Sequence, residues 1–336
     1  MKCTGRSKVR LQRSARIMAQ TRSRCVQWGR LVAVLLICIG PGAFVRCSEV
    51  LGEQPWLRQD PNRIHPLSLS ELKKLPSGQL EDLESDFNHI VVGKKDSMLT
   101  LYFKRGMYFY KETEIDLSIP HRLVLAYGKL SPAALLYAKN HSSFLMLGLG
   151  GGAITNYFHS YIPSMHIDAV EIDPMVARLA VRYFRSEPGT NYRIHLGDGR
   201  RFVQDTKSKY DLIMGDAYGG GFVPPHMITY QFYKECASHL NPGGVLFLNL
   251  YDEEVYQRSL AALYKLFDHV HTYFAVSNTS RIVIAFNGPA PDDAELYRRA
   301  RTLEDRYGFY HSLQDLISHK RVDRPEKGLQ PYYDEN

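Results

Sequence analysis

Residues 143–161 of this 336-residue chain, SFLMLGLGGGAITNYFHSY, indicate its fold. This stretch begins with an apolar run typical of a buried strand, continues through a loop rich in glycine, and ends in helix-forming sequence. Glycines at the end of a strand let a ligand approach the main chain, and the helix N-terminus that follows offers oriented N–H groups. Such glycines also occur in plain strand-to-helix turns, so the loop alone identifies no ligand.

Strands and helices alternate downstream of this stretch. Strands are expected at residues 143–147, 166–172, 193–196, 212–215 and 244–250, and helices at 153–161, 175–184, 200–206, 229–240 and 253–267. A closing strand pair is expected at 270–276 and 281–286, and an exposed helix at 292–307. This alternation is typical of a parallel sheet with crossover helices, so the predicted fold class is α/β.

The sequence before this region follows another pattern. Short β-branched and aromatic runs at 89–92, 98–103 and 107–111 predict a small antiparallel sheet, and residues 67–87 are expected to form short helical pieces. The predicted domains are a leader (1–47), a linker with short helices (48–88), a small β-domain (89–130), a nucleoside-binding α/β domain (131–290), and a C-terminal helix with a loose tail (291–336).

Two acidic residues follow the second strand of the α/β pattern. Glu171 comes nineteen residues after Gly152, close to the spacing at which a carboxylate accepts hydrogen bonds from ribose hydroxyls. Asp173 precedes Pro174 and is better interpreted as the N-cap of the next helix. We therefore predict Glu171 as a ribose ligand and Asp173 as a structural residue.

The third and fourth strands also end in acids. Asp198 lies between two glycines, where it could accept a hydrogen bond from an exocyclic amine such as that of adenine or cap the next helix. Asp216 precedes the Gly/Pro-rich loop 217–226, the place where open α/β sheets carry their chemistry. Asp216 is the candidate general base or the carboxylate that binds a cationic substrate. The alternative is a structural carboxylate that only accepts hydrogen bonds from the neighbouring glycine N–H groups.

This set of acids fits an adenosyl ligand better than a dinucleotide. The pattern Gly148-x-Gly150-x-x-Ala153 does match the looser NAD fingerprint, but no second phosphate contact is apparent. The Tyr230-x-x-x-Lys234 pair could suggest a short-chain reductase, but it lies on an aromatic helix and is interpreted as core packing.

In combination, five stretches resemble the spermidine synthases within the Rossmann-like methyltransferase superfamily. They are LMLGLGGGAI (145–154), DAVEIDPMVARLAVRYF (168–184), LGDGRRF (196–202), YDLIMGDAYGGGFVPPHMITYQFY (210–233) and HLNPGGVLFLNL (239–250). The resemblance implies a seven-stranded class I methyltransferase fold with a small N-terminal β-domain, and decarboxylated S-adenosylmethionine as co-substrate without a metal. It further implies a homodimer, Asp216 as the base that deprotonates the attacking amine, and a donor site made of Gly148, Gly150, Gly151, Gly152, Glu171 and Asp198.

The chain departs from this family at three places. In aminopropyltransferases the glycine loop carries an Asp that meets the donor's amine, and Gly151 stands there. A second Asp three residues after the base is replaced by Gly219, and the family's Tyr-Gln-Glu segment has no counterpart around residues 119–122. Substitute contacts to a polyamine acceptor are expected from Tyr218, His226 and Tyr251.

Three hypotheses remain open. The first is a spermidine-synthase-like transferase that moves an aminopropyl group to a polyamine. The second is a methyltransferase that uses ordinary S-adenosylmethionine, because the bare amides of residues 150–152 would suit a donor carboxylate better than an Asp would. The third is a noncatalytic adenosyl-binding protein. The first hypothesis is preferred to the other two because Asp216, the family's general base, is present.

The net charge of +7 belongs to the N-terminus. Residues 1–50 hold ten basic residues and one acid, so the remainder holds 32 basic and 34 acidic residues, which argues against nucleic-acid binding. An Arg-rich stretch followed by the apolar run 31–39 predicts a signal peptide, and hence an exported or membrane-associated protein. An organelle transit peptide and a wrongly assigned start are the alternatives. A cytoplasmic location also stays open, because the donor is made in the cytosol.

Overall fold

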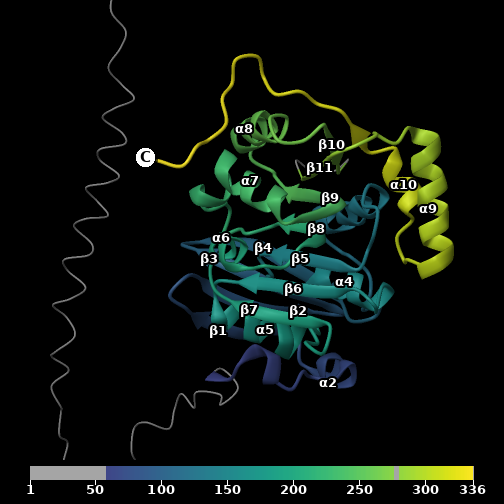
Figure 1. Ribbon diagram of the computed structural model, residues 1–336. Coiled ribbons are helices and arrows are strands. Elements are labelled where there is room, and N and C mark those ends of the chain that lie inside the picture. The colour runs from purple at the N-terminus through teal and green to yellow at the C-terminus, as the bar shows by residue number, and fades with distance from the viewer. Residues whose placement is uncertain (1–57, 276–279, 336) are drawn as a thin grey trace, which may run out of the picture. The chain divides into compact units, whose positions relative to one another are not determined.

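The computed structural model describes residues 58–275 and 280–335. Two sheets organise this part of the chain, one of eight strands and one of four (Figure 1). The predicted leader, residues 1–47, lies outside the described residues.

The larger sheet is parallel at its centre and antiparallel at one edge. Its strand order is β12-β10-β11-β9-β8-β5-β6-β7. The strands are β5 (Ser143–Leu147), β6 (His166–Glu171), β7 (Tyr192–Leu196), β8 (Tyr210–Gly215), β9 (Leu240–Asn249), β10 (His269–Phe274), β11 (Arg281–Phe286) and β12 (Lys320–Arg321). Strand β5 pairs in parallel with both β6 and β8, so the direction of winding reverses at β5. Open α/β sheets bind their ligands at such a switch point, outside the carboxyl ends of the strands.

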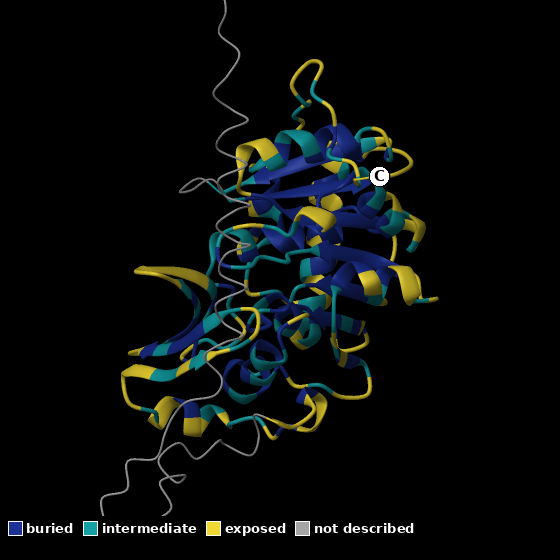
Figure 2. Cartoon of the chain, turned by 90° about the vertical axis from the view of Figure 1, so that its left-hand side faces the viewer, coloured by how far each residue is buried: buried dark blue, intermediate teal, exposed yellow. Residues whose placement is uncertain are grey.

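Helices cover both faces of this sheet. One core includes Phe144 and Met146 of β5 and is closed by α4 (Ala153–Tyr161), α5 (Pro174–Phe184), α9 (Asp293–Tyr307) and α10 (Leu313–Ile317). The other includes Leu145 and Leu147 and is closed by α6 (Gly199–Asp205), α7 (Tyr230–Ser238) and α8 (Glu253–Leu263). The central strands are therefore apolar on both faces and buried throughout, as Figure 2 shows.

The smaller sheet is an antiparallel meander packed on α5. It consists of β1 (Gly78–Glu84), β2 (His89–Lys95), β3 (Met98–Arg105) and β4 (Tyr108–Asp116). Helix α5 turns Ala177 and Ala180 toward the larger sheet, whereas Val176 and Leu179 join the core of the smaller one. Packing both sheets on one helix fixes β4 over the glycine loop, where the Gly151 N–H donates to Thr113 Oγ1 at 2.8 Å.

Two expectations for the N-terminal half hold only in part. Residues 67–87 form one helix, α2 (Leu69–Lys74), and then strand β1 instead of helical pieces. Strand β1 pairs with β2 and half-buries Leu80 and Leu83, so tertiary packing overrides the helix preference of its acidic residues. The strand expected at 107–111 continues to Asp116. Helix α3 (Ala126–Leu130) and the 3₁₀ helices η2 (Pro61–Arg63), η3 (Ser131–Leu136) and η4 (Pro225–Met227) complete the described elements.

The C-terminal tail is packed against the α/β domain and is not loose. Strand β12 pairs with β10 and adds an eighth strand to the seven that were expected. Tyr332 forms a bridge with Thr229 at the start of α7, and its carbonyl oxygen accepts from the Tyr230 N–H at 2.8 Å. The tail therefore crosses the helices of one face as an ordered strap.

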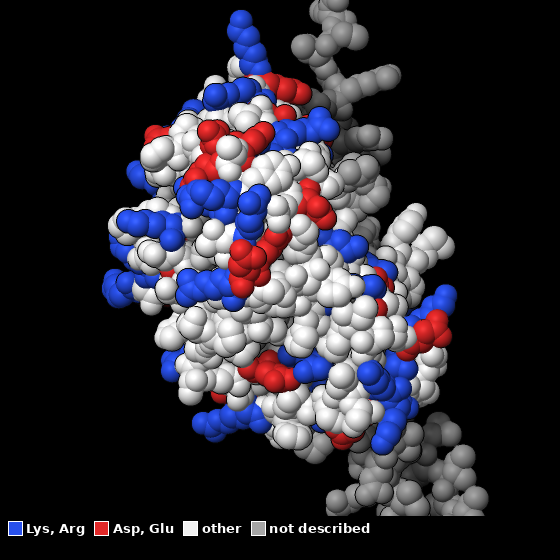
Figure 3. All heavy atoms as spheres, turned by 90° about the vertical axis from the view of Figure 1, so that its right-hand side faces the viewer, with Lys and Arg blue, Asp and Glu red and all other residues white. Residues whose placement is uncertain are grey.

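The surface around α9 carries both signs of charge (Figure 3). Arg298 and Arg299 pair with Glu295, and Lys320 pairs with Asp293. Positive and negative charges are therefore mixed on this face, which carries no electrostatic field of a single sign. Within the two described ranges, no helix has the length and apolar character that crossing a membrane requires.

Candidate functional site

The glycine loop brings the ends of β5 and β8 together. Gly148 has a φ of 92°, and a Cβ atom there would lie 2.3 Å from the carbonyl oxygen of Asp216. Only glycine fits this position, whether or not a ligand binds.

The other loop glycines have their amides occupied. The Gly150 N–H donates to Glu171 Oε2 at 3.2 Å, the Gly151 N–H to Thr113, and the Gly152 N–H to the Leu149 carbonyl oxygen at 2.9 Å. The N–H groups expected to receive a donor carboxylate are thus already bonded within the protein. Of the four predicted glycines, Gly148 alone lines the cavity described below.

Gly151 leaves no room for the acid that the family resemblance places there. A Cβ atom at this position would lie 2.7 Å from Thr113 Cγ2 and 2.9 Å from Phe184 Cγ. Real Cβ atoms essentially never approach so closely. Any side chain at residue 151 would therefore require the side chains of Thr113 and Phe184 to shift.

Glu171 is buried at the end of β6, where it ties the loop together. Its Oε2 accepts from the Leu149 N–H at 3.0 Å as well as from Gly150, and its Oε1 accepts from the Asp173 N–H at 3.0 Å. Burial raises the pKa of Glu171, and these amide hydrogen bonds oppose the rise. Asp173 caps α5 through the Met175 N–H at 2.9 Å, which confirms its predicted structural role.

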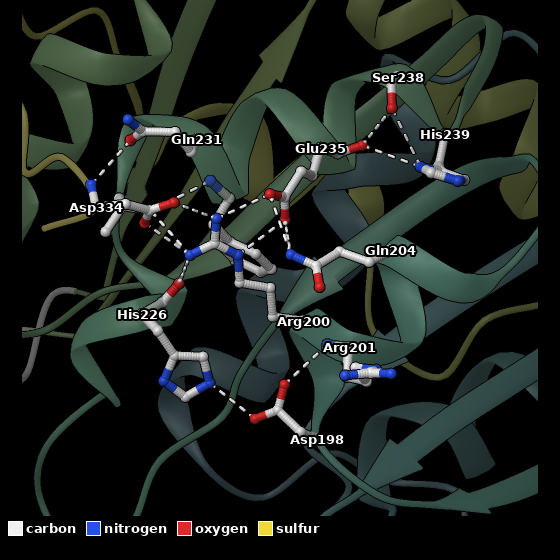
Figure 4. Close-up of polar contacts among 12 residues, drawn as sticks. Asp198, Arg200, Arg201, Gln204, His226, Gln231, Glu235, Ser238, His239 and Asp334 are labelled. Carbon is white, nitrogen blue, oxygen red and sulfur yellow. Dashed lines mark hydrogen bonds and ion pairs between the residues drawn. The ribbon is translucent and has the colours of Figure 1, made fainter. Parts of the chain in front are cut away.

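Asp198 combines a cap with a side-chain contact. Its Oδ1 accepts from the Arg201 N–H at 2.8 Å, so Asp198 is the N-cap of α6, the role that the sequence offered as the alternative to binding a ligand. Its Oδ2 lies 2.8 Å from His226 Nε2 (Figure 4). The structure thus brings together two residues to which the sequence assigned separate roles.

The C-terminal strap holds this edge of the site through Arg200. The buried Arg200 guanidinium donates to Glu235 of α7, to Asp334 of the tail, and to the His226 carbonyl oxygen at 3.0 Å (Figure 4). These two carboxylates raise the pKa of Arg200, so its charge is retained. No local pattern predicts this cluster, because its members are separated by as many as 134 residues.

Asp216 follows β8 and lies between two cavities. Its Oδ1 accepts from Asn249 Nδ2 at 2.9 Å, at the end of the neighbouring strand β9. Burial raises the pKa of Asp216 to about 7, the Asn249 hydrogen bond opposes the rise, and the charge of Glu171 adds to it. Such a carboxyl group can take up or release a proton near neutral pH.

The first cavity has a volume of about 210 Å³ and contains the predicted nucleoside ligands. Its polar lining includes Glu171, Asp198, Asp216, His226 and Arg105, and its apolar lining includes Phe103, Phe222 and Met227. This mixture of apolar walls and a few convergent polar groups is typical of a small-molecule site.

The second cavity, of about 340 Å³, shares Asp216 and Tyr218 with the first. Its lining includes Glu112, Asn249, Tyr110, Tyr127 and Tyr251. The Tyr218 hydroxyl donates to the Asn249 carbonyl oxygen at 2.8 Å and the Tyr251 hydroxyl donates to that of Gly221, so both hydroxyls are engaged and the rings form the wall. Of the three predicted acceptor contacts, Tyr218 and Tyr251 line this cavity and His226 lines only the first.

Other cavities and clusters add no further candidate. A wider cavity of about 660 Å³ beside α9 contains none of the predicted residues. In the described ranges, no three His, Cys, Asp or Glu side chains converge in a way that could hold a metal ion.

Sequence reasoning missed Glu112 and Arg105. Both come from the small sheet, in which the sequence analysis singled out no site residue. Arg105 stacks on Phe222 of the loop after β8, with 4.4 Å between the guanidinium carbon and the ring centroid. The stretch Tyr108–Asp116 holds three acids, and no local pattern distinguishes the one that reaches the cavity.

Known proteins resemble this chain in sequence and in fold. Residues 129–282 match the model of the spermine/spermidine synthase domain. The polyamine aminopropyltransferase of Chromobacterium violaceum is 30% identical over 212 residues, which cover 61% of this chain and 81% of that protein. That of Vibrio vulnificus is 30% identical over 187 residues, which cover 54% of this chain and 62% of that protein, less than two thirds of its length.

A probable spermidine synthase from Corynebacterium glutamicum has a similar fold, with a TM-score of 0.60 at 17% identity over 78% of this chain and 98% of that one. Methyltransferases also occur among the relatives. On the strength of the domain match and the relative from Chromobacterium, this chain belongs to the spermine/spermidine synthase family.

Proposed function

We propose that this protein transfers an aminopropyl group from decarboxylated S-adenosylmethionine to a polyamine acceptor, with Asp216 as the general base. One observation carries the proposal: Asp216 lines both a cavity suited to a nucleoside and a second cavity walled by tyrosines and an acid. The relatives that bear the name polyamine aminopropyltransferase support the same reaction.

The donor would occupy the first cavity. Glu171 would accept hydrogen bonds from the ribose hydroxyls and Asp198 from the adenine amine. Each carboxylate already accepts from the protein, but two oxygens offer about four acceptor positions, so both acids keep capacity for a ligand. Phe103 and Met227 would contact the apolar parts of the nucleoside.

Asp216 would then serve the chemical step. The lone pair of the acceptor nitrogen attacks the methylene carbon next to the sulfonium, the new C–N bond forms as the C–S bond breaks, and the sulfur leaves as a neutral thioether. The proton displaced from nitrogen passes to the Asp216 carboxylate. A base with a pKa of about 7 is matched to this task near neutral pH, and Asn249 fixes its orientation.

A methyltransferase remains the second candidate, and Arg105 favours it. This guanidinium lines the donor cavity and could pair with the carboxylate of ordinary S-adenosylmethionine. The loop amides that first suggested this reaction are occupied, however. We therefore place methyl transfer second.

Donor and product analysis would decide between the two reactions. Calorimetry with both donors, followed by mass spectrometry after incubation with 1,4-diaminobutane, should show tighter binding of the decarboxylated donor and formation of an aminopropylated product. Preference for the carboxylated donor would contradict the proposal. Failure of both donors to bind below about millimolar concentration would favour a noncatalytic protein.

Asp216→Asn should lower turnover by about 10²- to 10⁴-fold and leave donor binding nearly unchanged.

The proposed location rests on the N-terminal sequence alone. We propose that residues 1–47 act as a signal peptide that directs the protein out of the cytosol or to a membrane. Sequencing the N-terminus of the mature protein from fractionated cells would test this. An intact N-terminus in the cytosolic fraction would contradict it.

A further inference from the structure

Glu112 owes its position to an irregularity in the small sheet. Along β3 and β4, Leu101 pairs with Thr113 and Tyr102 pairs with Lys111, so Glu112 is an extra residue in β4 without a partner on β3. Such a bulge redirects side chains and is frequent beside functional sites. Here Thr113 contacts the glycine loop while Glu112 lines the second cavity.

The carboxylate of Glu112 differs from those of its neighbours in its hydrogen bonding within the described part of the chain. Glu114 accepts from Thr100 Oγ1 at 3.0 Å and from Lys111 Nζ at 2.5 Å, and Asp116 pairs with Arg122 at 2.9 Å. Among the described residues, none donates a hydrogen bond to the Glu112 side chain, and the Tyr127 hydroxyl donates to its backbone carbonyl oxygen at 3.0 Å. The main chain of Glu112 is therefore fixed while its carboxylate stays open to the cavity.

The surroundings of this carboxylate suit an alkylammonium group. The rings of Tyr110, Tyr127, Tyr218 and Tyr251 line the same cavity, and Asp216 lines both cavities. Lys111 also lines the second cavity, and its ammonium group pairs with Glu114. Aromatic faces and carboxylates both attract an organic cation. Burial and the charges of Asp216 and Glu171 raise the pKa of Glu112 to about 8, and Arg105 opposes this rise, so a bound cation would relieve repulsion among these acids.

We propose that Glu112 binds the ammonium group at the nonreacting end of the acceptor, a role that rests on the proposed function. It would replace the acid that aminopropyltransferases carry at the position of Gly219. A Cβ atom at Gly219 would meet nothing closer than Phe222 at 3.8 Å and Arg105 at 3.9 Å, so space is not what excludes an acid there. In the proposed arrangement, the bulge in β4 supplies the negative charge instead, through Glu112 in the second cavity. Glu112 thus selects acceptors with a second cationic end.

Two acceptors and one matched variant test this role in the full-length protein. The acceptors are 1,4-diaminobutane and 4-amino-1-butanol, in which a hydroxyl replaces one amine. Glu112→Gln should raise the KM for the diamine about 10- to 100-fold, change the KM for the amino alcohol less than about twofold, and leave the donor Kd and kcat nearly unchanged. Glu114→Gln, on the same strand but bonded within the sheet, should leave the preference for the diamine as in the wild type. Thermal unfolding would verify that both variants are folded.

The outcomes separate this role from the proposed reaction. Equal effects of Glu112→Gln on both acceptors, no effect on either, or weakened donor binding would each refute the role. If the wild type forms no aminopropylated product, the proposed reaction fails, and calorimetry with 1,4-diaminobutane decides the role of Glu112. Weaker diamine binding by Glu112→Gln than by Glu114→Gln would support it. Equal binding by the two variants, or no binding by the wild type, would refute it.

Discussion

Replacing Asp216 with Asn should stabilise the protein, and increasingly so as the pH rises. Folding raises the pKa of this carboxyl group from 3.8 to about 7, chiefly through burial. A carboxyl group with a raised pKa favours the folded state while it is protonated, and loses that contribution as the pH rises from about 4 to about 7. The Asn side chain does not titrate, and its amide oxygen can still accept from Asn249 Nδ2.

The magnitude follows from the two pKa values. Each pH unit in this range corresponds to ~1.4 kcal/mol, so the variant's advantage approaches ~4 kcal/mol above pH ~7. Between about pH 5 and about pH 8, the difference in unfolding free energy between variant and wild type should therefore grow by ~2 to 3 kcal/mol.

Urea unfolding at several pH values measures this difference, with Asp305→Asn on the exposed surface of α9 as the control for loss of one carboxylate. A difference that stays flat would show that folding leaves the pKa of Asp216 unshifted, and one that shrinks would show that the anion is stabilised in the folded state; either would refute the reasoning. That result would also remove the basis for assigning it as a base near neutral pH.

Two further substitutions test the frame of the site. Gly148→Ala should lower the free energy of unfolding by at least ~3 kcal/mol, because it adds a clash with the end of β8 to the strain of a positive φ. In the control Gly288→Ala, the residue has a φ of 94° and open space around it, so the free energy of unfolding should fall by only ~1 kcal/mol. Equal losses in the two variants would contradict the close approach of Gly148 to Asp216. Asp334→Ala removes one of the two carboxylates that pair with the buried Arg200. It should lower the free energy of unfolding by ~1 to 3 kcal/mol and expose the tail to proteolysis. Glu335→Ala, at the exposed neighbouring residue, should have neither effect.

Features set by local sequence could be predicted well. The strand at 143–147 and the helix at 153–161 have the expected bounds, because an apolar run, a glycine turn and a helical segment follow one another without a gap. The capping roles of Asp173 and Asp198 were recognisable for the same reason, since a cap bonds to residues two or three positions away. The carboxyl ends of parallel strands also meet at one edge, which explains why Glu171, Asp198 and Asp216 line one cavity.

Features set by contacts between distant segments could not be predicted. Strand β1 is acidic and becomes a strand only by pairing with β2. The tail looks loose by composition, and its order depends on Arg200, 134 residues earlier. The bulge that directs Glu112 into the second cavity depends on its pairing with β3, and no residue type in the sequence marks it.

The departures from the family pattern are connected through strand β4. The Thr113 side chain fills the space beside Gly151 and accepts from its N–H, so an acid at residue 151 would require that side chain to shift. The bulge that sets Thr113 there also sets Glu112, the preceding residue, beside the second cavity. The space beside the glycine loop and the acid in the second cavity therefore depend on the same segment of β4. Restoring Asp at residue 151 alone should consequently destabilise the protein without adding a donor contact, because the new side chain would meet Thr113 and Phe184 before it could reach the cavity.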